Sequence, residues 1–582
     1  MQTATAAPAH TPDTGHPKGL YVLFTTEMWE RFAYYGMRAI LKLYMAKFLL
    51  FDEKFSSEVY GSYTGLVYLT PLLGGYIADR YWGNRRSILV GGILMALGQF
   101  ALFASASGAP DSALAHPMFY TGLAFMIFGN GFFKPNISSM VGSLYPRNDS
   151  RIDAAYTIFY MGINLGAFFS PLICGKLGDT GSPADFKWGF LAAGIGMIIG
   201  AITFELLKGR YVVGPEGAAL GARPEAKVND ASTPATAGIS NSKLAGLGAL
   251  FVGVFAAWYW LVGVDLIGAF IFTAMVVVPL VVISDPSLTA REKEKIYVVF
   301  ILSFFVIFFW GAFEQAGNSL TTFADRQTDR HLGSLVIPAS YFQSINPLGI
   351  ILLAPVFALV WTALGKRGLE PSSPLKMAIG LALLALGYFI IAFGVKDASP
   401  TAKVSMFWLT AMYLVHTFGE LCLSPIGLAL VNKLSPVRFA SLMMAVWFLA
   451  TAAGNKFSGT LGALYPEQMV SVSRVEQLEK ESGQTLFPAA FKKAEAPRIA
   501  DVAVISADKV ALEDIKDEKV REQVSQSLYT TLVPNPKKMA GFTINSFYDF
   551  FMVFVFLCGA TAFLLMLIYR RLTRMMDEPV AV

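Results

Sequence analysis

The sequence predicts an all-α polytopic membrane protein with about fourteen membrane spans. The first observation is compositional: of 582 residues, 54% are hydrophobic and only 15% are charged, and the mean hydropathy is +0.52. Soluble domains carry more charge, about a quarter of their residues. The second observation is that apolar segments of membrane length recur along almost the whole chain, separated by polar or basic loops.

The apolar segments form two groups of six with a close-set pair between them. The expected spans are 20–51, the segment from Glu58 to the Gly74–Arg86 loop, 87–107, 116–142, 154–176, 187–208, 244–262, 265–284, 297–323, 340–364, 375–395, 404–432, 438–464 and 546–570.

These spans and the polar segments between them predict a division of the chain. The expected parts are a tail (1–19), a six-helix bundle (20–208), a linker rich in Pro, Ala, Gly and Ser (209–243), an extra hairpin (244–284), a charged linker (285–296), five helices of a second bundle (297–464), a polar insertion (465–545), the last transmembrane helix (546–573) and a C-terminal tail (574–582).

The distribution of basic residues predicts the orientation. The loop with Arg85 and Arg86 and the other Arg- and Lys-containing loops on the same side indicate the cytoplasm. Residues 1–19 lack an apolar stretch with a cleavage site, so we expect both tails to be cytoplasmic. The insertion 465–545 then lies outside, either as a functional loop or as a decoration of this lineage.

Cysteine usage and the absence of paired nucleophiles argue against an enzyme. The three cysteines all lie in apolar segments without the spacing of a metal site: Cys174, Cys422 and Cys558. We expect them to be small buried hydrophobic residues. His416 stands alone in its span. We therefore expect no metal, no cofactor and no catalytic residue.

The first span carries a polar stripe. Glu27, Glu30, Arg31, Tyr34 and Arg38 share one helical face within an otherwise apolar run. A charge held at mid-membrane depth costs roughly 2.5–3.5 kcal/mol on insertion scales, so this face must meet protein or a watery cavity. It is either a structural ion pair between helices or part of an ion or proton path, and the second use is typical of such clusters.

The two groups of spans show weak self-similarity. Gly129–Pro135 in the fourth span matches Gly419–Pro425 in the tenth, counted without the hairpin, and Pro71–Gly74 has a counterpart in Pro347–Gly349. Such matches in corresponding spans indicate six plus six helices related by a pseudo-twofold axis. Paired Gly/Pro-interrupted segments also indicate a central transporter site.

Few other polar groups lie within spans, and they divide by sign. The first group of spans holds an excess of bases, Arg31, Arg38 and Lys134, and the second offers the carboxylates Glu314 and Glu420. A cavity with one basic and one acidic wall suits a zwitterion. Each buried amide, such as Asn164 or Asn346, is either a ligand to such a solute or a hydrogen bond between helices. Aromatic residues offer apolar walls tolerant of varied side chains: Tyr34, Tyr35, Tyr68, Trp310 and Trp447.

The stretch Glu27-x-x-Glu30-Arg31-Phe32-x-Tyr34-Tyr35 resembles the ExxERFxYY signature of the proton-dependent oligopeptide transporters (POT/PTR), a branch of the major facilitator superfamily. Gly75–Arg86 resembles the superfamily's cytoplasmic loop motif with one extra residue before the Gly. Gly129–Ser138 and Phe159–Gly166 resemble two further family signatures, and 244–284 resembles the extra helix pair of bacterial members. The long insertion departs from the short loop usual in the family.

The resemblance implies the major facilitator fold and proton-driven import of di- and tripeptides by alternating access. It implies proton coupling by Glu27, Glu30, Arg31, Lys134 and Glu314. It implies substrate binding by Tyr34, Arg38, Tyr68, Lys134, Asn164, Trp310, Asn346, Glu420 and Trp447. It also implies a periplasmic gate formed by Arg38 and Glu314.

The expected partners are di- and tripeptides, protons and membrane lipid, with no nucleic acid, and the expected location is the inner membrane of a bacterium. A symporter of another small solute on the same fold, such as nitrate or an amino-acid-like compound, is the alternative; Glu420 favours an amine-bearing substrate. A channel is disfavoured, because channels do not need opposed ionic walls at broken helices.

Overall fold

The computed structural model describes residues 15–109, 112–146, 149–223, 241–396, 398, 403–436, 439–466, 468–470, 480, 532–534, 537–539 and 541–576. Most of the predicted N-terminal tail and of the insertion lies outside the described residues, as do 224–240 of the linker and 577–582 of the C-terminal tail.

The described chain is helical, as the sequence predicts. Its first group is α1 (Lys18–Lys47), α2 (Glu53–Leu69), α3 (Pro71–Ile77), η1 (Ala78–Trp82), α4 (Asn84–Ser105), α5 (Ala115–Ser143), α6 (Ile152–Gly178), η2 (Pro183–Asp185) and α7 (Phe186–Tyr211). The intervening pair is α8 (Asn241–Ala256), which continues into η3 (Ala257–Val262), and α9 (Leu266–Ile283).

The second group is α10 (Ala290–Phe313), η4 (Glu314–Gly317), α11 (Ser319–Arg326), η5 (Ala339–Ser344), α12 (Ile345–Lys366), α13 (Ser373–Val395), α14 (Met406–Leu434), α15 (Ala440–Gly462) and α21 (Phe547–Met575). The described strands are two or three residues long and pair as β1 (Thr328–Asp329) with β4 (Val404–Ser405), β2 (His331–Leu332) with β3 (Leu335–Val336), β5 (Gln468–Val470) with β6 (Leu532–Pro534), and β7 (Lys537–Met539) with β8 (Phe542–Ile544).

Among the described helices, ten are long and apolar enough to cross a membrane by length and composition. The remaining long helices include α1, α5 and α15, whose polar residues lower their hydropathy. The second predicted span is divided at Thr70, because Pro71 begins a new helix and has no N–H to continue the old one.

Side-chain caps define where several helices begin. The Asp52 carboxylate accepts from the Phe55 N–H at 2.9 Å at the start of α2, and Asp265 does the same for Gly268 at the start of α9. Reciprocal capping boxes begin α10 at Thr289 and α21 at Ser546.

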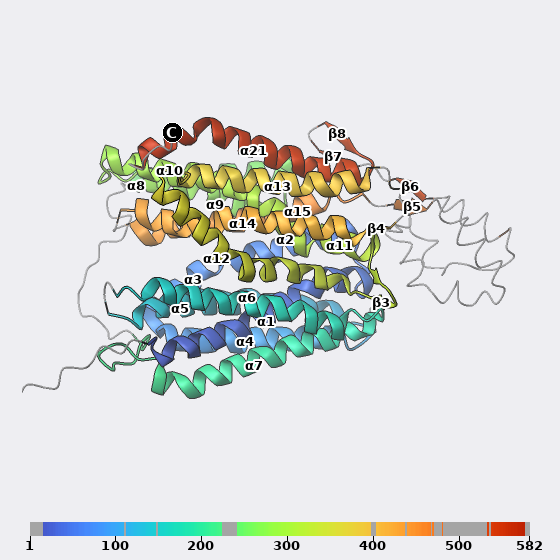
Figure 1. Ribbon diagram of the computed structural model, residues 1–582, viewed down its shortest axis with the longest axis horizontal. Coiled ribbons are helices and arrows are strands. Elements are labelled where there is room, and N and C mark those ends of the chain that lie inside the picture. The colour runs from blue at the N-terminus through green and yellow to red at the C-terminus, as the bar shows by residue number, and fades with distance from the viewer. Residues whose placement is uncertain are drawn as a thin grey trace, which may run out of the picture.

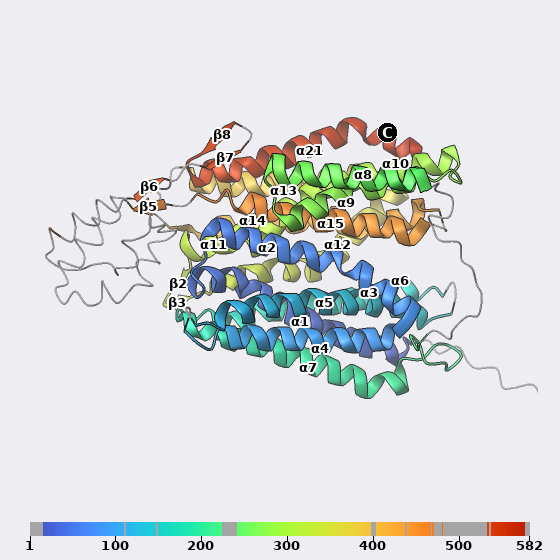
Figure 2. The same ribbon diagram turned by 180° about the vertical axis from the view of Figure 1, so that it is seen from behind.

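The helices form two halves with a seam between them (Figures 1 and 2). Helices α1, α4, α5, α6 and α7 lie in one half, and α10, α13, α14, α15 and α21 lie in the other. Within the halves, α1 packs on α6 and α7, and α13 packs on α14 and α21. The seam is made by α2 against α15 and by α6 against α12 and η5, and α9 of the extra hairpin packs on α15 and α2.

Glycines allow the closest approach at this seam. A Cβ on Gly61 of α2 would lie 2.7 Å from the Cα of Gly459 of α15, a distance that no side chain tolerates. At this level the two halves are therefore in backbone contact.

The segment after α7 returns to the loop between η1 and α4. Arg85 donates to the carbonyl oxygens of Leu220 and Lys208 at 2.6 and 3.1 Å, and also to that of Val212. Gly83, at φ +74°, lies against Ala222, where a Cβ would come within 2.4 Å of a carbonyl oxygen. The basic loop thus holds the start of the linker.

Candidate functional site

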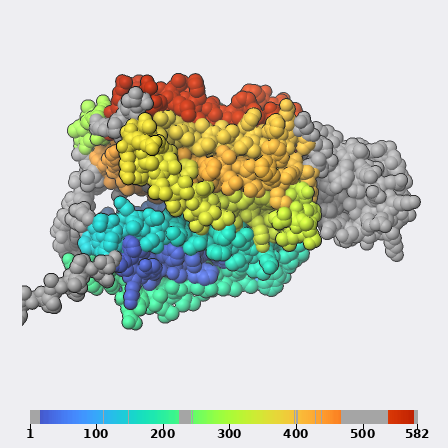
Figure 3. Space-filling view, viewed as in Figure 1, coloured from blue at the N-terminus to red at the C-terminus, as the bar shows by residue number. Residues whose placement is uncertain are grey.

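A cavity of about 2870 Å³ lies between the two halves. At one end its walls include Asp79 of η1, Asp153 of α6 and Arg223 of the linker, and at the other end it stops at Arg38 and Glu314. Figure 3 shows the molecular surface hollowed between the two halves on the side where α5 and α12 end and α6 begins. The cavity is thus open at one end and closed at the other.

Most of the predicted site residues meet in this cavity. Those on its wall are Arg31, Arg38, Tyr68, Lys134, Asn164, Trp310, Glu314, Asn346, Glu420 and Trp447. The predicted residues absent from the wall are Glu27, Glu30 and Tyr34, which are buried beside it.

The buried cluster on α1 consists of Glu27, Glu30 and Arg31. The Arg31 guanidinium lies 3.3 Å from Glu27 and donates to Glu30 through both Nε and Nη2, the second bond at 2.8 Å. Asn130 of α5 donates a further bond of 3.0 Å to Glu30. Glu27 Oε2 is buried without a hydrogen-bond partner among the described residues, so this carboxylate is the less fully satisfied one.

Lys134 lies one residue before Pro135 on α5, on the cavity wall. Its ammonium is 4.5 Å from the centre of the Tyr68 ring, within cation–π range. It interacts electrostatically with Glu27, Glu30 and Arg31. Within the described part of the chain no carboxylate lies within ion-pair distance of Lys134, so its charge faces the cavity.

The opposite wall carries Glu420 of α14 and Asn346 of α12. Asn346 Nδ2 donates to Glu420 Oε2 at 2.8 Å and to the Thr417 hydroxyl at 3.2 Å. Across the cavity, Asn164 of α6 donates to the Tyr160 carbonyl at 2.9 Å. The amides are thus held from one side and keep their carbonyl oxygens for other partners.

The aromatic residues divide between wall and core. Tyr68, Trp310 and Trp447 line the cavity, and so does Tyr35. The Tyr34 side chain is 1% exposed and its hydroxyl is buried without a partner. Tyr34 does not line the cavity, so its contact with a substrate stays a prediction.

Arg38 and Glu314 pair at the closed end of the cavity. Arg38 Nη1 lies 3.0 and 3.2 Å from the two oxygens of Glu314, and the Tyr60 hydroxyl donates to Glu314 at 3.4 Å. Glu314 begins η4, a 3₁₀ turn that interrupts the predicted span 297–323. Such interruptions often mark functional hinges. Gly317 permits the close packing, because a Cβ there would lie 1.9 Å from the Tyr60 hydroxyl.

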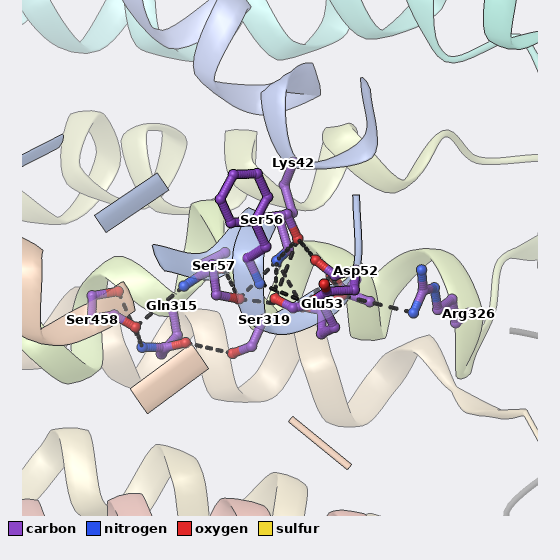
Figure 4. A network of polar contacts seen from close by, with 12 residues as sticks. Lys42, Asp52, Glu53, Ser56, Ser57, Gln315, Ser319, Arg326 and Ser458 are labelled. Atoms are coloured by element: carbon purple, nitrogen blue, oxygen red, sulfur yellow. Dashed lines mark hydrogen bonds and ion pairs between the residues drawn. The ribbon is translucent and has the colours of Figure 1, made fainter. Parts of the chain in front are cut away.

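A second polar network lies beyond this pair (Figure 4). Lys42 of α1 is fully buried and lies 2.8 Å from Glu53 Oε1, with the Ser56 and Ser57 hydroxyls each at 2.7 Å. From the other half, Arg326 approaches Glu53 Oε2 at 3.7 Å. The Thr322 hydroxyl donates to Glu53 at 3.3 Å. The network therefore joins the two halves at the closed end.

Two further contacts secure the same end. Lys47 of α1 lies 2.7 Å from Asp325 of α11 and 3.5 Å from Asp179, which follows α6. Asp179 also accepts from the Ala339 backbone N–H of η5 at 3.2 Å. Lys42, Glu53 and Lys47 are not among the site residues that the sequence predicts, although Lys42 continues the α1 stripe four residues after Arg38.

Comparison with known proteins identifies the family of this protein. The model of the POT family (PTR2) matches residues 85–478. The chain belongs to the POT family. It is therefore a multi-pass membrane transporter with the fold of that family within the major facilitator superfamily, as the sequence predicts, and not an enzyme.

Individual relatives agree. The chain is 36% identical to the peptide transporter YePEPT of Yersinia enterocolitica over 490 residues, which cover 79% of this chain and 90% of that protein. It is 31% identical to the dipeptide and tripeptide permease A of Escherichia coli over 472 residues, covering 80% and 88%. A solved mutant of peptide transporter POT in complex with alafosfalin matches with TM-score 0.65 at 31% identity, covering 89% of this chain and 97% of that one.

Proposed function

We propose that this POT-family transporter imports di- and tripeptides together with protons by alternating access. The observation that carries the proposal is a single cavity with Arg38 and Lys134 on one wall and Glu420 and Asn346 on the other. A short peptide at neutral pH is a zwitterion whose backbone charges are independent of its side chains. Opposed ionic walls select this feature, and the aromatic walls tolerate side chains of different sizes.

The two ends of the peptide take different partners. Arg38 and Lys134 receive the carboxylate, with Tyr68 and Asn164 beside it. Glu420 and Asn346 receive the ammonium, because a carboxylate and an amide oxygen are acceptors for its N–H groups. Trp310 and Trp447 form the apolar sides of the site, and Tyr34 supports it from behind.

Proton coupling is assigned to the buried cluster of α1 and to Lys134. Glu30 is held by Arg31 and Asn130 when it is ionised. Protonation of Glu27 or Glu30 would release part of the Arg31 charge toward the cavity, where a substrate carboxylate can neutralise it. Glu314 belongs to the coupling set through its pairing with Arg38, which must break when the closed end opens.

The conformation supports a gate at the closed end. In alternating access one end of the binding cavity opens while the other is sealed. Arg38 and Glu314 pair at the sealed end, and the basic loops lie at the open end. The open end therefore faces the cytoplasm of a bacterium, with both chain termini on that side of the inner membrane. With this orientation the chain divides into two bundles, a hairpin between them and an insertion on the periplasmic side.

The test is transport by the full-length protein in proteoliposomes. Labelled dialanine should accumulate when the outside is acidic, and a protonophore should abolish the accumulation. Nitrate and single amino acids serve as competitors for the alternative substrates. Competition by nitrate but not by trialanine would overturn the peptide assignment, and uptake that neither saturates nor depends on protons would overturn symport.

A further inference from the structure

We propose that His416 is a third ligand of the substrate ammonium, beside Glu420 and Asn346, an inference that rests on the proposed peptide substrate. His416 lies on α14, four residues before Glu420, so the two side chains leave the same helical face about 5–6 Å apart. Both line the cavity, as does Asn346. His416 has no part in the proposed proton coupling or in the proposed gate.

The tautomer of His416 follows from its neighbour. Its Nε2 lies 3.2 Å from the Leu384 backbone carbonyl of α13. A carbonyl oxygen only accepts, so Nε2 carries the hydrogen and the neutral ring has its lone pair on Nδ1. The ring is also packed against Tyr388, with ring centres 4.7 Å apart. His416 is thus a fixed imidazole that presents one acceptor.

The orientation of that acceptor follows from packing. A Cβ on Gly387 of α13 would lie 2.4 Å from His416 Cδ2 and 2.6 Å from Nε2, so the Cδ2–Nε2 edge of the ring faces α13. In a five-membered ring the atom opposite this edge is Nδ1. Nδ1 therefore points away from α13, and within the described ranges it makes no hydrogen bond. His416 is 2% exposed, and it is among the residues that line the cavity.

Three acceptors are then available for one ammonium group. Asn346 donates through Nδ2 to Glu420 and Thr417, which leaves its Oδ1 as an acceptor. Glu420 Oε1 is the carboxylate oxygen that Asn346 does not engage. His416 Nδ1 is the third. An ammonium has three N–H donors, so this set distinguishes a primary amine from alkylated or acylated amines by the number of hydrogen bonds it satisfies.

Two substitutions separate this role from a structural one. His416→Gln places an amide nitrogen near the position of Nε2, so it keeps the bond to Leu384 and loses the acceptor at Nδ1. His416→Asn places an amide oxygen near Nδ1, so it keeps the acceptor and loses the bond to Leu384. If His416 only ties α14 to α13, His416→Asn is the damaging change; if it binds the ammonium, His416→Gln is.

The measurement is the affinity of the purified full-length protein for dialanine and for N-acetyl-dialanine. His416→Gln should weaken dialanine binding about ten- to a hundredfold, the effect of one hydrogen bond to a charged group, and should leave N-acetyl-dialanine nearly unchanged. His416→Asn should retain most of the preference for the free amine. A preference that survives in His416→Gln and falls in His416→Asn would overturn the inference.

A series of ligands on the unmodified protein gives a second test that does not depend on the variants folding. N-methyl- and N,N-dimethyl-dialanine keep the charge but have two and one N–H donors, so affinity should fall at each step. Equal affinity of dialanine and its N,N-dimethyl derivative would overturn the inference. Failure of the unmodified protein to bind dialanine at all would instead refute the proposed function.

Discussion

Loss of Glu53 should unlock the closed end of the transporter more severely than loss of Lys42. Glu53 lies 2.8 Å from Lys42 and 3.7 Å from Arg326, and all three side chains are almost fully buried. Glu53→Gln takes one carboxylate away from two cations. Lys42→Met leaves Glu53 its contact with Arg326.

The magnitude follows from burial. Removing one partner of a buried ion pair costs about 3–5 kcal/mol, because the other charge stays desolvated. When the closed end opens, water reaches Lys42 and Arg326 and the penalty disappears. Glu53→Gln should therefore shift the equilibrium toward the opened state by roughly two to three and a half powers of ten. The double variant Lys42→Met/Glu53→Gln removes one of the two buried cations that contact Glu53 and should recover part of the closure.

Disulfide trapping can report this equilibrium. A Cβ on Gly175 of α6 would lie 1.9 Å from the Ser340 Oγ of η5, the atom that Ser340→Cys replaces, and 3.0 Å from the Ser340 Cβ, and a shift of about half an ångström brings the two Cβ atoms to disulfide distance. The pair Gly175→Cys and Ser340→Cys spans the two halves at the closed end, and replacing the three native cysteines, all of them buried, removes background.

Cross-linking should be fastest in the parent, slightly slower with Lys42→Met, slowest with Glu53→Gln and intermediate in the double variant. Lys54→Ala, which alters an exposed pair with Glu58 at 3.9 Å, is the control and should not change the rate. Equal rates for Glu53→Gln and the parent, or a double variant no faster than Glu53→Gln, would refute the charge argument.

Glu30→Gln mimics the protonated carboxyl permanently, so proton-driven dialanine uptake by proteoliposomes should vanish while exchange with internal dialanine persists; loss of both would make Glu30 a folding residue. Gly317→Ala should slow the same disulfide cross-linking by more than tenfold, because the new methyl group would lie 1.9 Å from a tyrosine hydroxyl of α2, whereas Gly246→Ala, with nothing within 4 Å, should not. Asp265→Ala removes the carboxylate that both contacts a buried lysine of α15 and caps α9, so thermal unfolding in detergent should show a loss of about 1–3 kcal/mol, against nearly none for Lys54→Ala.

The sequence predicted the helical class and the cluster on α1 because both depend on local pattern. A charge inside an apolar run is visible without any tertiary information, and Glu27, Glu30 and Arg31 share a helical face by spacing alone. The pairing of Arg38 with Glu314 appeared as an expectation from family resemblance, and the structure places the two groups 3.0 Å apart.

Other features depend on how α1 is rotated and what packs on it. Tyr34 and Tyr35 are adjacent in sequence, and their side chains diverge by about 100° around the helix. The neighbours of α1 decide that Tyr35 meets the cavity and Tyr34 the core. Lys42 lies near the end of an apolar run, where a lysine commonly extends its side chain to the membrane surface. Its burial depends on Glu53 of the next helix, which the sequence pattern does not connect to it.

The contacts of α1 suggest how a proton on one end of the stripe affects the gate at the other. Arg31 pairs with Glu30 inside one half, whereas Arg38 pairs with Glu314 across the two halves, so only the second pair must break when the closed end opens. The ring of Tyr35 joins them, since Arg31 lies 5.9 Å and Arg38 5.0 Å from its centre. Neutralising Glu30 leaves Arg31 with less negative charge around it, and the two guanidiniums that lie near one aromatic ring then repel each other more strongly. The same repulsion weakens the ion pair between Arg38 and Glu314. A substrate carboxylate that enters the cavity reduces this repulsion. Under the proposed roles of these residues, coupling between proton and peptide needs no movement within α1, only a change in which anion balances its two arginines.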